Sequence, residues 1–400
     1  MSHIAERLSR ISVSQSIAMA EEARRLRGEG KSVINLAIGE PDFDTPKHVQ
    51  LAAIKAILDG KTRYTDVSGT VELRNAIVES VRKNLNVEYG LNEVIVSTGG
   101  KQVIYNAMVA SLNPGDEVLI PTPCWVSYPD IVSLAEGIPV FLPCGEESGF
   151  KLTPDQLENA ITPKTRWLIL NNPCNPTGAA YSEDEIKGLC DVLLKHPDVW
   201  VLTDDIYDRI VFSNFKVSTF VKAEPSLKSR VLTVNGCSKT YAMTGWRLGY
   251  ATGPAELIRA MVKLQGQSTT NPSSISQAAA VEALTGSQAF LDDMVASYES
   301  RRDYLVRRLN EIDGMSCATP QGAFYVFPNI KRLFGKKTKA GSSIESDLDF
   351  SLALLKEKYV AAVHGSAYIF PGYVRIGYAL DQDSISEAVD RIADFCAEMS

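Results

Sequence analysis

One lysine of this chain stands in a segment whose composition suits covalent chemistry. The segment from Asn235 to Arg247 reads NGCSKTYAMTGWR and follows the apolar run RVLTV. A lysine amine held among apolar residues and backbone, away from a carboxylate partner, loses its charge readily and can form a Schiff base. The segment fails the nucleotide phosphate-loop pattern, because Ser238 and Thr233 stand where glycine is required. Lys239 is therefore either a solvated surface charge or a catalytic amine.

A pair of carboxylates follows another apolar run. The stretch TDDIYDR places Asp204 and Asp205 directly after VWVL, with Tyr207 close behind. A carboxylate at the end of a strand can hold a cationic ring nitrogen, and a nearby tyrosine can bind a ring hydroxyl. The alternative is that an aspartate caps a following helix. Because neighbouring strand residues point to opposite faces, we expect at most one aspartate to face a given pocket.

Two further segments combine turn residues with polar groups. Residues 171–178 read NNPCNPTG, a rigid proline-rich loop that fixes the amide of Asn175, or else a plain turn before a helix that starts after Ser182. Residues 97–102 read STGGKQ, where a strand ends and a helix begins near Lys101. The amides and dipole of such a helix start attract a phosphate or carboxylate, although a glycine turn is also a common plain connection.

The elements that must position these segments are short apolar runs. Seven of them read EVIVST, EVLIPT, IPVFLP, TRWLILNN, DVWVLTDD, RVLTVNG and RLGYATG, with helical stretches between them. Such runs predict the buried strands of a mainly parallel sheet and an α/β fold. In open α/β sheets ligands bind at the carboxyl ends of the strands, where the four polar segments lie.

The chain is long enough for more than one domain. We predict an N-terminal segment over residues 1–44 that packs with a small domain, a large α/β domain over 45–285, and a small α+β domain over 286–400. The small domain opens on the amphipathic stretch SQAFLDDMVASYESRRDYLVRRLNEI. It continues with GAFYVFP, a polar loop, and a closing helix near SISEAVDRIADF.

Composition excludes several classes of protein. Apolar residues make up 45% and charged residues 22% of the 400 residues, as in soluble globular chains. The net charge of -7, without a basic cluster, argues against nucleic acid as a partner. Seven cysteines without a CxxC pair, and four histidines without ligand spacing, predict a reducing compartment and no metal site. Neither a signal peptide nor an 18-residue apolar run is present, so we expect a cytoplasmic protein away from membranes.

Eight motifs, read in order, resemble those of the class I pyridoxal-phosphate-dependent aminotransferases, and most closely those of bacterial aspartate aminotransferases. They are GEPDFDTP, YTDVSGTVELR, STGGKQ, PTPCWVSYP, NNPCNPTG, DDIYDRIVF, NGCSKTYAMTGWRLGY and VRIGYA, within a likeness that spans about residues 10 to 395. The resemblance implies the fold type I architecture, in which helices cover the mainly parallel sheet of the large domain. It also implies pyridoxal 5'-phosphate as cofactor, and amino acids and 2-oxo acids as substrates.

The resemblance assigns covalent binding and proton transfer to one residue. Lys239 matches the lysine that holds the cofactor covalently and, once released, carries the substrate proton. Asp204 matches the carboxylate beside the pyridine nitrogen. Tyr207 and Asn175 match the pair that binds the ring hydroxyl oxygen, and Arg247 matches the phosphate-binding arginine.

The remaining matches complete both binding sites. Tyr64 matches a tyrosine that reaches the phosphate of a neighbouring subunit, which implies a homodimer with shared sites, and Arg375 matches the arginine that grips the substrate α-carboxylate. Ser238 is the weaker assignment, because Gly236 stands where the family often has serine. The implied cofactor-binding set is Tyr64, Gly100, Lys101, Trp125, Asn175, Asp204, Tyr207, Ser238, Lys239 and Arg247, and the substrate-binding set is Ser16, Gly39, Lys101, Trp125, Asn175 and Arg375.

The expected substrates are acidic. In the branch that this chain resembles, residues at the positions of Lys101 and Ser16 hold the distal carboxylate, which favours L-aspartate and 2-oxoglutarate, giving oxaloacetate and L-glutamate. Two alternatives share the scaffold: a dual aspartate/prephenate aminotransferase that makes arogenate, and a β-lyase for cysteine conjugates. A cofactor-sensing regulator would need an added DNA-binding region, for which the roughly ten residues before the likeness leave no room.

Overall fold

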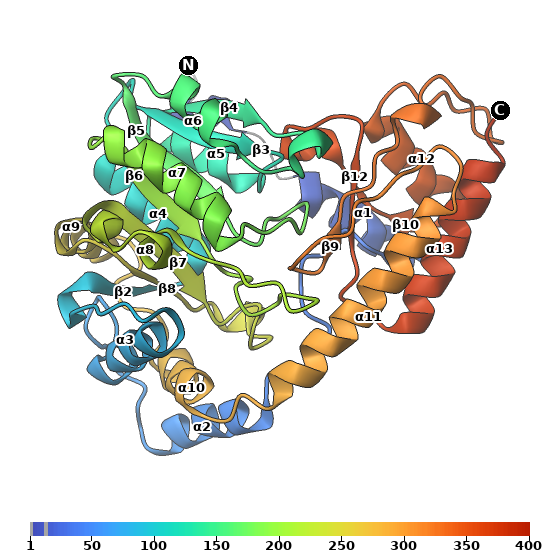
Figure 1. The fold of residues 1–400 in the computed structure, drawn as a ribbon. Helices are drawn as coiled ribbons and strands as arrows, with labels where there is room; N and C mark the ends of the chain where they lie inside the picture. The colour runs from blue at the N-terminus through green and yellow to red at the C-terminus, as the bar shows by residue number, and fades with distance from the viewer. Residues whose placement is uncertain (1–2, 12–14) are drawn as a thin grey trace.

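A mainly parallel sheet forms the centre of the larger body in Figure 1. The computed structural model describes residues 3–11 and 15–400, and within them this sheet has seven strands in the order β2-β8-β7-β6-β5-β3-β4. Strand β8 runs antiparallel to both of its neighbours, and the other pairs are parallel. The strands are β2 (Val94–Ser97), β3 (Glu117–Thr122), β4 (Ile138–Pro143), β5 (Thr165–Asn171), β6 (Trp200–Asp204), β7 (Val231–Gly236) and β8 (Gly249–Thr252). The seven apolar runs thus predicted these strands correctly.

Helices cover both faces of the sheet. One face packs against the helices α4 (Gly100–Ser111), α5 (Ser127–Leu134) and α9 (Ala255–Gln265), through a cluster of buried aliphatic side chains. The opposite face packs against α6 (Pro154–Ala160), α7 (Glu183–Lys195) and α8 (Phe220–Ala223). The remaining helices of this body are α2 (Lys47–Leu58), α3 (Val71–Leu85) and α10 (Ser274–Thr285).

Local sequence explains where these helices begin. Helix α7 starts after Ser182, whose hydroxyl accepts the amide of Glu185 while the Glu185 carboxylate accepts the amide of Ser182. This reciprocal capping satisfies amides that the first helical turn leaves without partners. Helix α4 starts at Gly100, shortly after strand β2, and Gly99 provides no side-chain cap for its first amides.

The smaller body contains α11 (Phe290–Asn310), α12 (Asp347–Lys358) and α13 (Gln382–Ala397), at the right of Figure 1. Its antiparallel strands are β9 (Tyr325–Val326), β11 (Val363–His364) and β12 (Val374–Gly377). Strand β1 (Ile34–Asn35), which follows helix α1 (Gln15–Gly28), pairs in parallel with β10 (Val360–Ala361). The N-terminal segment is thereby joined to the smaller body, and the domain limits at residues 45 and 286 stay a prediction.

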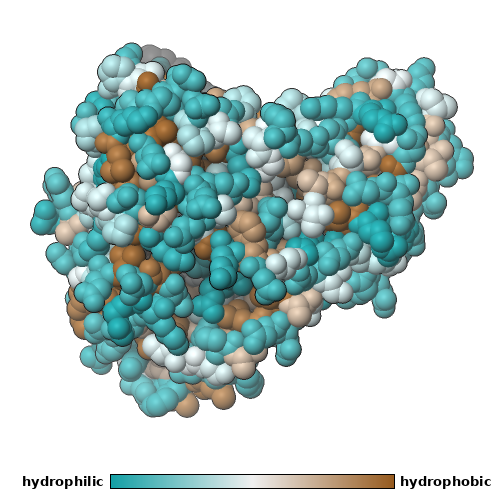
Figure 2. Space-filling view, viewed as in Figure 1, coloured by the Kyte–Doolittle hydropathy of each residue, from teal (hydrophilic) through white to brown (hydrophobic). Residues whose placement is uncertain are grey.

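The face in Figure 2 is mostly hydrophilic, with apolar residues in scattered groups and a notch between the two bodies at the top of the view. Among the described residues, the helices are all too short or too polar to cross a membrane.

Candidate active site

A cavity of about 740 Å³ lies where strands β5, β6 and β7 end. The N-terminal segment and the smaller body also contribute side chains to it. Most of the residues that the motifs predicted line this cavity: Gly39, Gly100, Lys101, Trp125, Asn175, Asp204, Tyr207, Ser238, Lys239, Arg247 and Arg375. Tyr64 lies elsewhere and is 89% exposed, and the side chain of Ser16, in helix α1, is outside the described part of the structure.

The amine of Lys239 lies inside the cavity, just beyond strand β7. Its Nζ donates a hydrogen bond to the carbonyl oxygen of Gly39 at 2.6 Å. The same atom lies 5.9 Å from the ring centroids of both Tyr207 and Phe324. Burial lowers the pKa of this amine from 10.5 to about 8. A substantial fraction is therefore neutral and nucleophilic near physiological pH.

Asp204 ends strand β6 with its carboxylate in the cavity. It is 7% exposed, and its Oδ2 accepts a hydrogen bond from Tyr128 Oη at 2.7 Å. Burial raises the pKa of this carboxyl from 3.8 to about 6. Asp205 turns away and accepts a hydrogen bond from Thr203 Oγ1 at 2.5 Å. The prediction that only one of the two faces the pocket is confirmed, and a turn rather than a helix follows them.

Arg375 lies in strand β12 of the smaller body and contacts both the larger body and the N-terminal segment within the site. The residue is 3% exposed; its Nη1 donates to Asn175 Oδ1 at 3.1 Å and its Nη2 donates to the carbonyl oxygen of Ala37. Its Nε has no hydrogen-bond partner within the described residues. The guanidinium carbon lies 4.6 Å from the ring centroid of Tyr325. A buried cation with a spare donor and no carboxylate partner suits an anionic ligand.

A second cationic group lies at the start of helix α4. The side chain of Arg247 lies so close to Gly99 that a Cβ there would be 2.5 Å from Arg247 Nη2. Gly99 also has φ of +87°, a conformation that favours glycine. The guanidinium of Arg247 and the first amides of α4 therefore form an anion-binding corner.

Lys101 and Trp125 form another wall of the cavity. Lys101 Nζ lies 4.8 Å from the ring centroid of Trp125, whose ring meets Tyr128 edge-on at 5.3 Å. Partial burial lowers the pKa of Lys101, and the charge of Arg247 lowers it further. An anion beside Lys101 would raise this pKa again.

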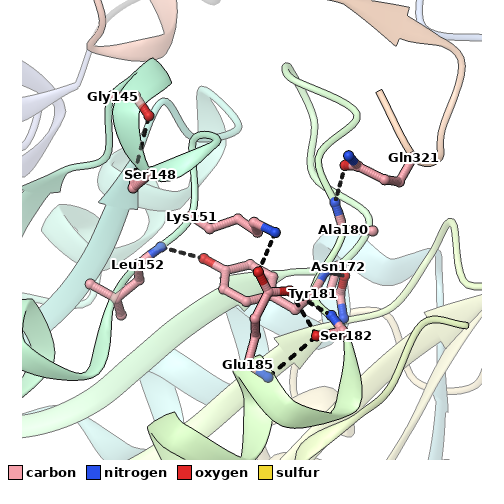
Figure 3. Close-up of polar contacts among 10 residues, drawn as sticks. All are labelled: Gly145, Ser148, Lys151, Leu152, Asn172, Ala180, Tyr181, Ser182, Glu185 and Gln321. Carbon is pink, nitrogen blue, oxygen red and sulfur yellow. Dashed lines mark hydrogen bonds and ion pairs between the residues drawn. The ribbon is translucent and has the colours of Figure 1, made fainter. Parts of the chain in front are cut away.

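Three hydrogen bonds hold the loop that carries Asn175 and the residues that follow it. Asn171 Oδ1 accepts the amide of Asn175 at 2.6 Å from within the loop. Figure 3 shows the outer contacts: the amide of Ala180 donates to Gln321 Oε1 at 3.2 Å, and the amide of Tyr181 donates to Asn172 Oδ1 at 2.9 Å. Because Gln321 belongs to the smaller body, this loop connects the site to both bodies.

Sequence patterns missed three residues that hold the site together. Tyr128 supports Asp204, Asn171 positions Asn175, and Tyr325 contacts Tyr207. Two of them lie inside quoted motifs, PTPCWVSYP and NNPCNPTG, and the third lies in GAFYVFP. No local spacing rule marks Tyr128 or Tyr325, because their partners lie 76 and 118 residues away in the chain. Among the described residues there is no cluster of three His, Cys, Asp or Glu side chains that could hold a metal ion.

Comparisons with known proteins agree with these features. The family model for aminotransferase class I and II matches residues 31–392. The chain is 51% identical over 400 residues to an aspartate/prephenate aminotransferase of Cereibacter sphaeroides, covering 100% of both chains. It is 51% identical over 396 residues to an aspartate aminotransferase of Rhizobium meliloti, covering 99% of this chain and 97% of that protein.

Solved structures show the same fold. The aspartate aminotransferase of Rhizobium meliloti superposes with a TM-score of 0.97 at 51% identity, covering 100% of both chains. That of Thermus thermophilus, solved with maleate, superposes with a TM-score of 0.92 at 37% identity, covering 99% of this chain and 100% of the other. The predicted fold is therefore confirmed. Motifs, fold and full-length relatives together show that this chain is an aminotransferase of the class I and II family, a family that uses pyridoxal phosphate.

Proposed function

We propose that this protein is a pyridoxal-phosphate-dependent aspartate aminotransferase that converts L-aspartate and 2-oxoglutarate to oxaloacetate and L-glutamate. The observation that carries the proposal is one cavity in which a low-pKa lysine amine and a buried carboxylate lie together with the guanidinium groups of Arg247 and Arg375. The substrate assignment is supported by relatives about half identical over their full length that are named aspartate aminotransferases.

The residues of the cavity fit pyridoxal phosphate. Arg247 and the start of helix α4 suit its phosphate, and Asp204 suits a protonated ring nitrogen. Tyr207 and Asn175 are the residues that we assign to the ring hydroxyl, with Trp125 against the ring face and Ser238 as a further phosphate ligand. When bound, the cofactor supplies an electron-withdrawing ring that stabilises negative charge at the substrate α-carbon.

Lys239 is the residue that we propose to move protons. Its amine would hold the cofactor covalently, and once freed by the substrate it would remain in the same cavity. A base is most effective when its pKa lies near the working pH, and burial gives this amine a pKa of about 8. The free amine would then take the proton from the substrate α-carbon and pass a proton on to the cofactor within the same half-reaction, acting first as base and then as acid.

Asp204 supplies a fixed negative charge. Its pKa of about 6 still leaves the carboxylate ionised at neutral pH, but at an energetic cost caused by burial. A protonated ring nitrogen would offset this cost, while the hydroxyl of Tyr128 keeps the carboxylate oriented.

Two cationic side chains suit the two ends of a dicarboxylic substrate. Arg375 has an unpartnered Nε in the described structure, and Gly39 lies in the adjoining N-terminal segment, so we assign the α-carboxylate to this corner. Burial lowers the pKa of Lys101, and a distal carboxylate beside it would stabilise its charged form, so we assign that end of the substrate to Lys101. The second group proposed for that carboxylate, Ser16, has a side chain outside the described residues.

We also propose a homodimer in which Tyr64 reaches the cofactor of the neighbouring subunit. Tyr64 is 89% exposed in the single chain, far more than a site residue of that chain would be. Nearby helix α2 exposes Leu51, Ile54 and Leu58, an apolar surface that suits burial against a second copy. Sedimentation analysis should find a dimer, and a monomer at micromolar concentration with full activity would contradict it.

A test of the cofactor uses colour. Wild-type protein that has been incubated with pyridoxal phosphate and freed of unbound cofactor should be yellow, and Lys239→Ala should remove the absorbance band. Lys263→Ala, a change at an exposed lysine of helix α9, is the matched control and should keep the band. A wild type that stays colourless with added cofactor would refute the assignment.

A test of the substrates compares amino donors and acceptors. Aspartate with 2-oxoglutarate should give the highest kcat/KM, and failure to use oxaloacetate as acceptor in the reverse direction would exclude the proposal. The second candidate is a dual aspartate/prephenate aminotransferase, because the relative from Cereibacter sphaeroides carries that name. Rates with oxaloacetate and prephenate as acceptors separate the two, since only the dual enzyme forms arogenate.

A further inference from the structure

Tyr325 contacts three parts of the site at once. It begins strand β9 of the smaller body and is 1% exposed. Its Oη lies 2.8 Å from Tyr207 Oη, and its ring lies 4.6 Å from the guanidinium carbon of Arg375. A Cβ built on Gly39 would clash with the same Oη. Neither composition nor motif spacing pointed to this residue.

In the hydrogen bond between Tyr207 and Tyr325, either hydroxyl can be the donor, and a bound ligand would decide which one donates. Burial raises the pKa of both phenols, so each carries one proton. Either oxygen can donate in the structure without a ligand. If Tyr207 donates its only proton to a ligand oxygen, it can only accept from Tyr325. The ring of Phe324 lies 4.9 Å from the Tyr325 ring, in apolar surroundings where such linked hydrogen bonds strengthen one another.

We propose that Tyr325 is a positioning residue for the reaction described under Proposed function, on which this inference rests. Its hydroxyl donates to Tyr207 and so directs the proton of Tyr207 toward the ring hydroxyl oxygen of the cofactor. Its aromatic ring packs against the guanidinium of Arg375, the group that we assign to the substrate α-carboxylate. One side chain of the smaller body thereby acts on both the cofactor and the substrate ends of the site.

The two contributions can be separated by substitution. Tyr325→Phe removes the hydroxyl and keeps the ring, whereas Tyr325→Leu removes both. With Tyr325→Phe, the pH midpoint of the absorbance change of the bound cofactor should rise by about half a pH unit, because Tyr207 becomes a weaker donor. The KM for aspartate should stay within about twofold. With Tyr325→Leu, that KM should rise by roughly tenfold, because the cation–π contact is lost.

A control and a double variant separate this role from a general loss of packing. Tyr378→Phe removes another buried hydroxyl of the smaller body, one that donates to the carbonyl oxygen of Ala323 at 3.2 Å, and it should leave the midpoint unchanged. In a Tyr207→Phe background, adding Tyr325→Phe should produce no further shift of the midpoint. Circular dichroism and thermal unfolding check that each variant folds.

A second route covers failure of the phenylalanine variant to fold. Gly39→Ala would place a methyl group against Tyr325 Oη and displace it, so the midpoint should rise as it does for Tyr325→Phe. An unchanged midpoint in Tyr325→Phe or in Gly39→Ala overturns the inference. A further shift of the midpoint when Tyr325→Phe is added to Tyr207→Phe also overturns it. Those results are distinct from a wild type without Lys239-dependent absorbance, which would refute the proposed function itself.

Discussion

Replacing Asp204 by asparagine should stabilise the cofactor-free protein at neutral pH and remove most of the activity of the cofactor-loaded enzyme. Burial raises the pKa of Asp204 from 3.8 to about 6, so the folded state binds this proton more tightly than the unfolded chain. The free energy of unfolding therefore falls as pH rises from about 4 to about 6. Above about pH 6 the ionised, buried carboxylate destabilises the folded state by its full amount. Roughly two pH units of difference correspond to about 3 kcal/mol at neutral pH.

Asparagine has no charge and keeps an oxygen that can accept the hydroxyl of Tyr128. Its added N–H groups need acceptors, which offsets the gain by about 1 kcal/mol. Asp204→Asn should therefore be about 2 kcal/mol more stable than wild type at pH 7.5, and about 1 kcal/mol less stable at pH 4. Its kcat should fall by about tenfold to hundredfold, because a charge-assisted hydrogen bond to the ring nitrogen of the cofactor is lost.

Urea unfolding of the cofactor-free proteins at pH 4 and pH 7.5 measures the effect. Asp198→Asn, at an exposed position shortly before strand β6, is the control and should show the same pH dependence as wild type. If the stability difference between Asp204→Asn and wild type is the same at both pH values, the burial argument for this carboxylate is wrong.

Three further predictions test other parts of the site. Lys101→Ala should lower kcat/KM for aspartate about tenfold or more while that for phenylalanine changes little, since only the acidic substrate loses a charge-assisted contact; equal losses would remove its role in selectivity. Because only the neutral amine of Lys239 attacks and its pKa is about 8, stopped-flow rates of cofactor capture should rise with pH and level off above pH 8; a rise that continues to pH 10 would contradict this. Gln321→Ala should lower the free energy of unfolding by about 1 kcal/mol and raise the KM for aspartate a few-fold, because the amide of Ala180 loses its acceptor and the loop of Asn175 loosens; unchanged thermal unfolding and KM would show that this contact does not hold the loop.

Much of the fold and many of the site residues could be predicted from local sequence. Apolar runs bounded by turn residues marked all seven strands of the large sheet, because burial between two layers of helices requires continuous apolar side chains. The polar segments after those strands contained Asp204, Asn175 and Lys239, since ligand groups of an α/β sheet lie just beyond the strands. Neighbouring strand residues point to opposite faces, which limited the pocket to one of the two aspartates.

Other features depend on parts of the chain that are distant in sequence. Tyr128 precedes its partner Asp204 by 76 residues, and Gly39 precedes Lys239 by 200. Tyr325 reaches Tyr207 across 118 residues. The first pair depends on packing within the larger body and the other two on how the bodies pack together, and a local pattern carries no information about either.

The sequence by itself therefore determined the strands, the family and most of the groups able to do chemistry. Only the tertiary structure decided the pKa values of those groups. A pKa depends on the desolvation and the charges around a group, so the values of about 8 for Lys239 and about 6 for Asp204 arise only when the surrounding chain encloses them.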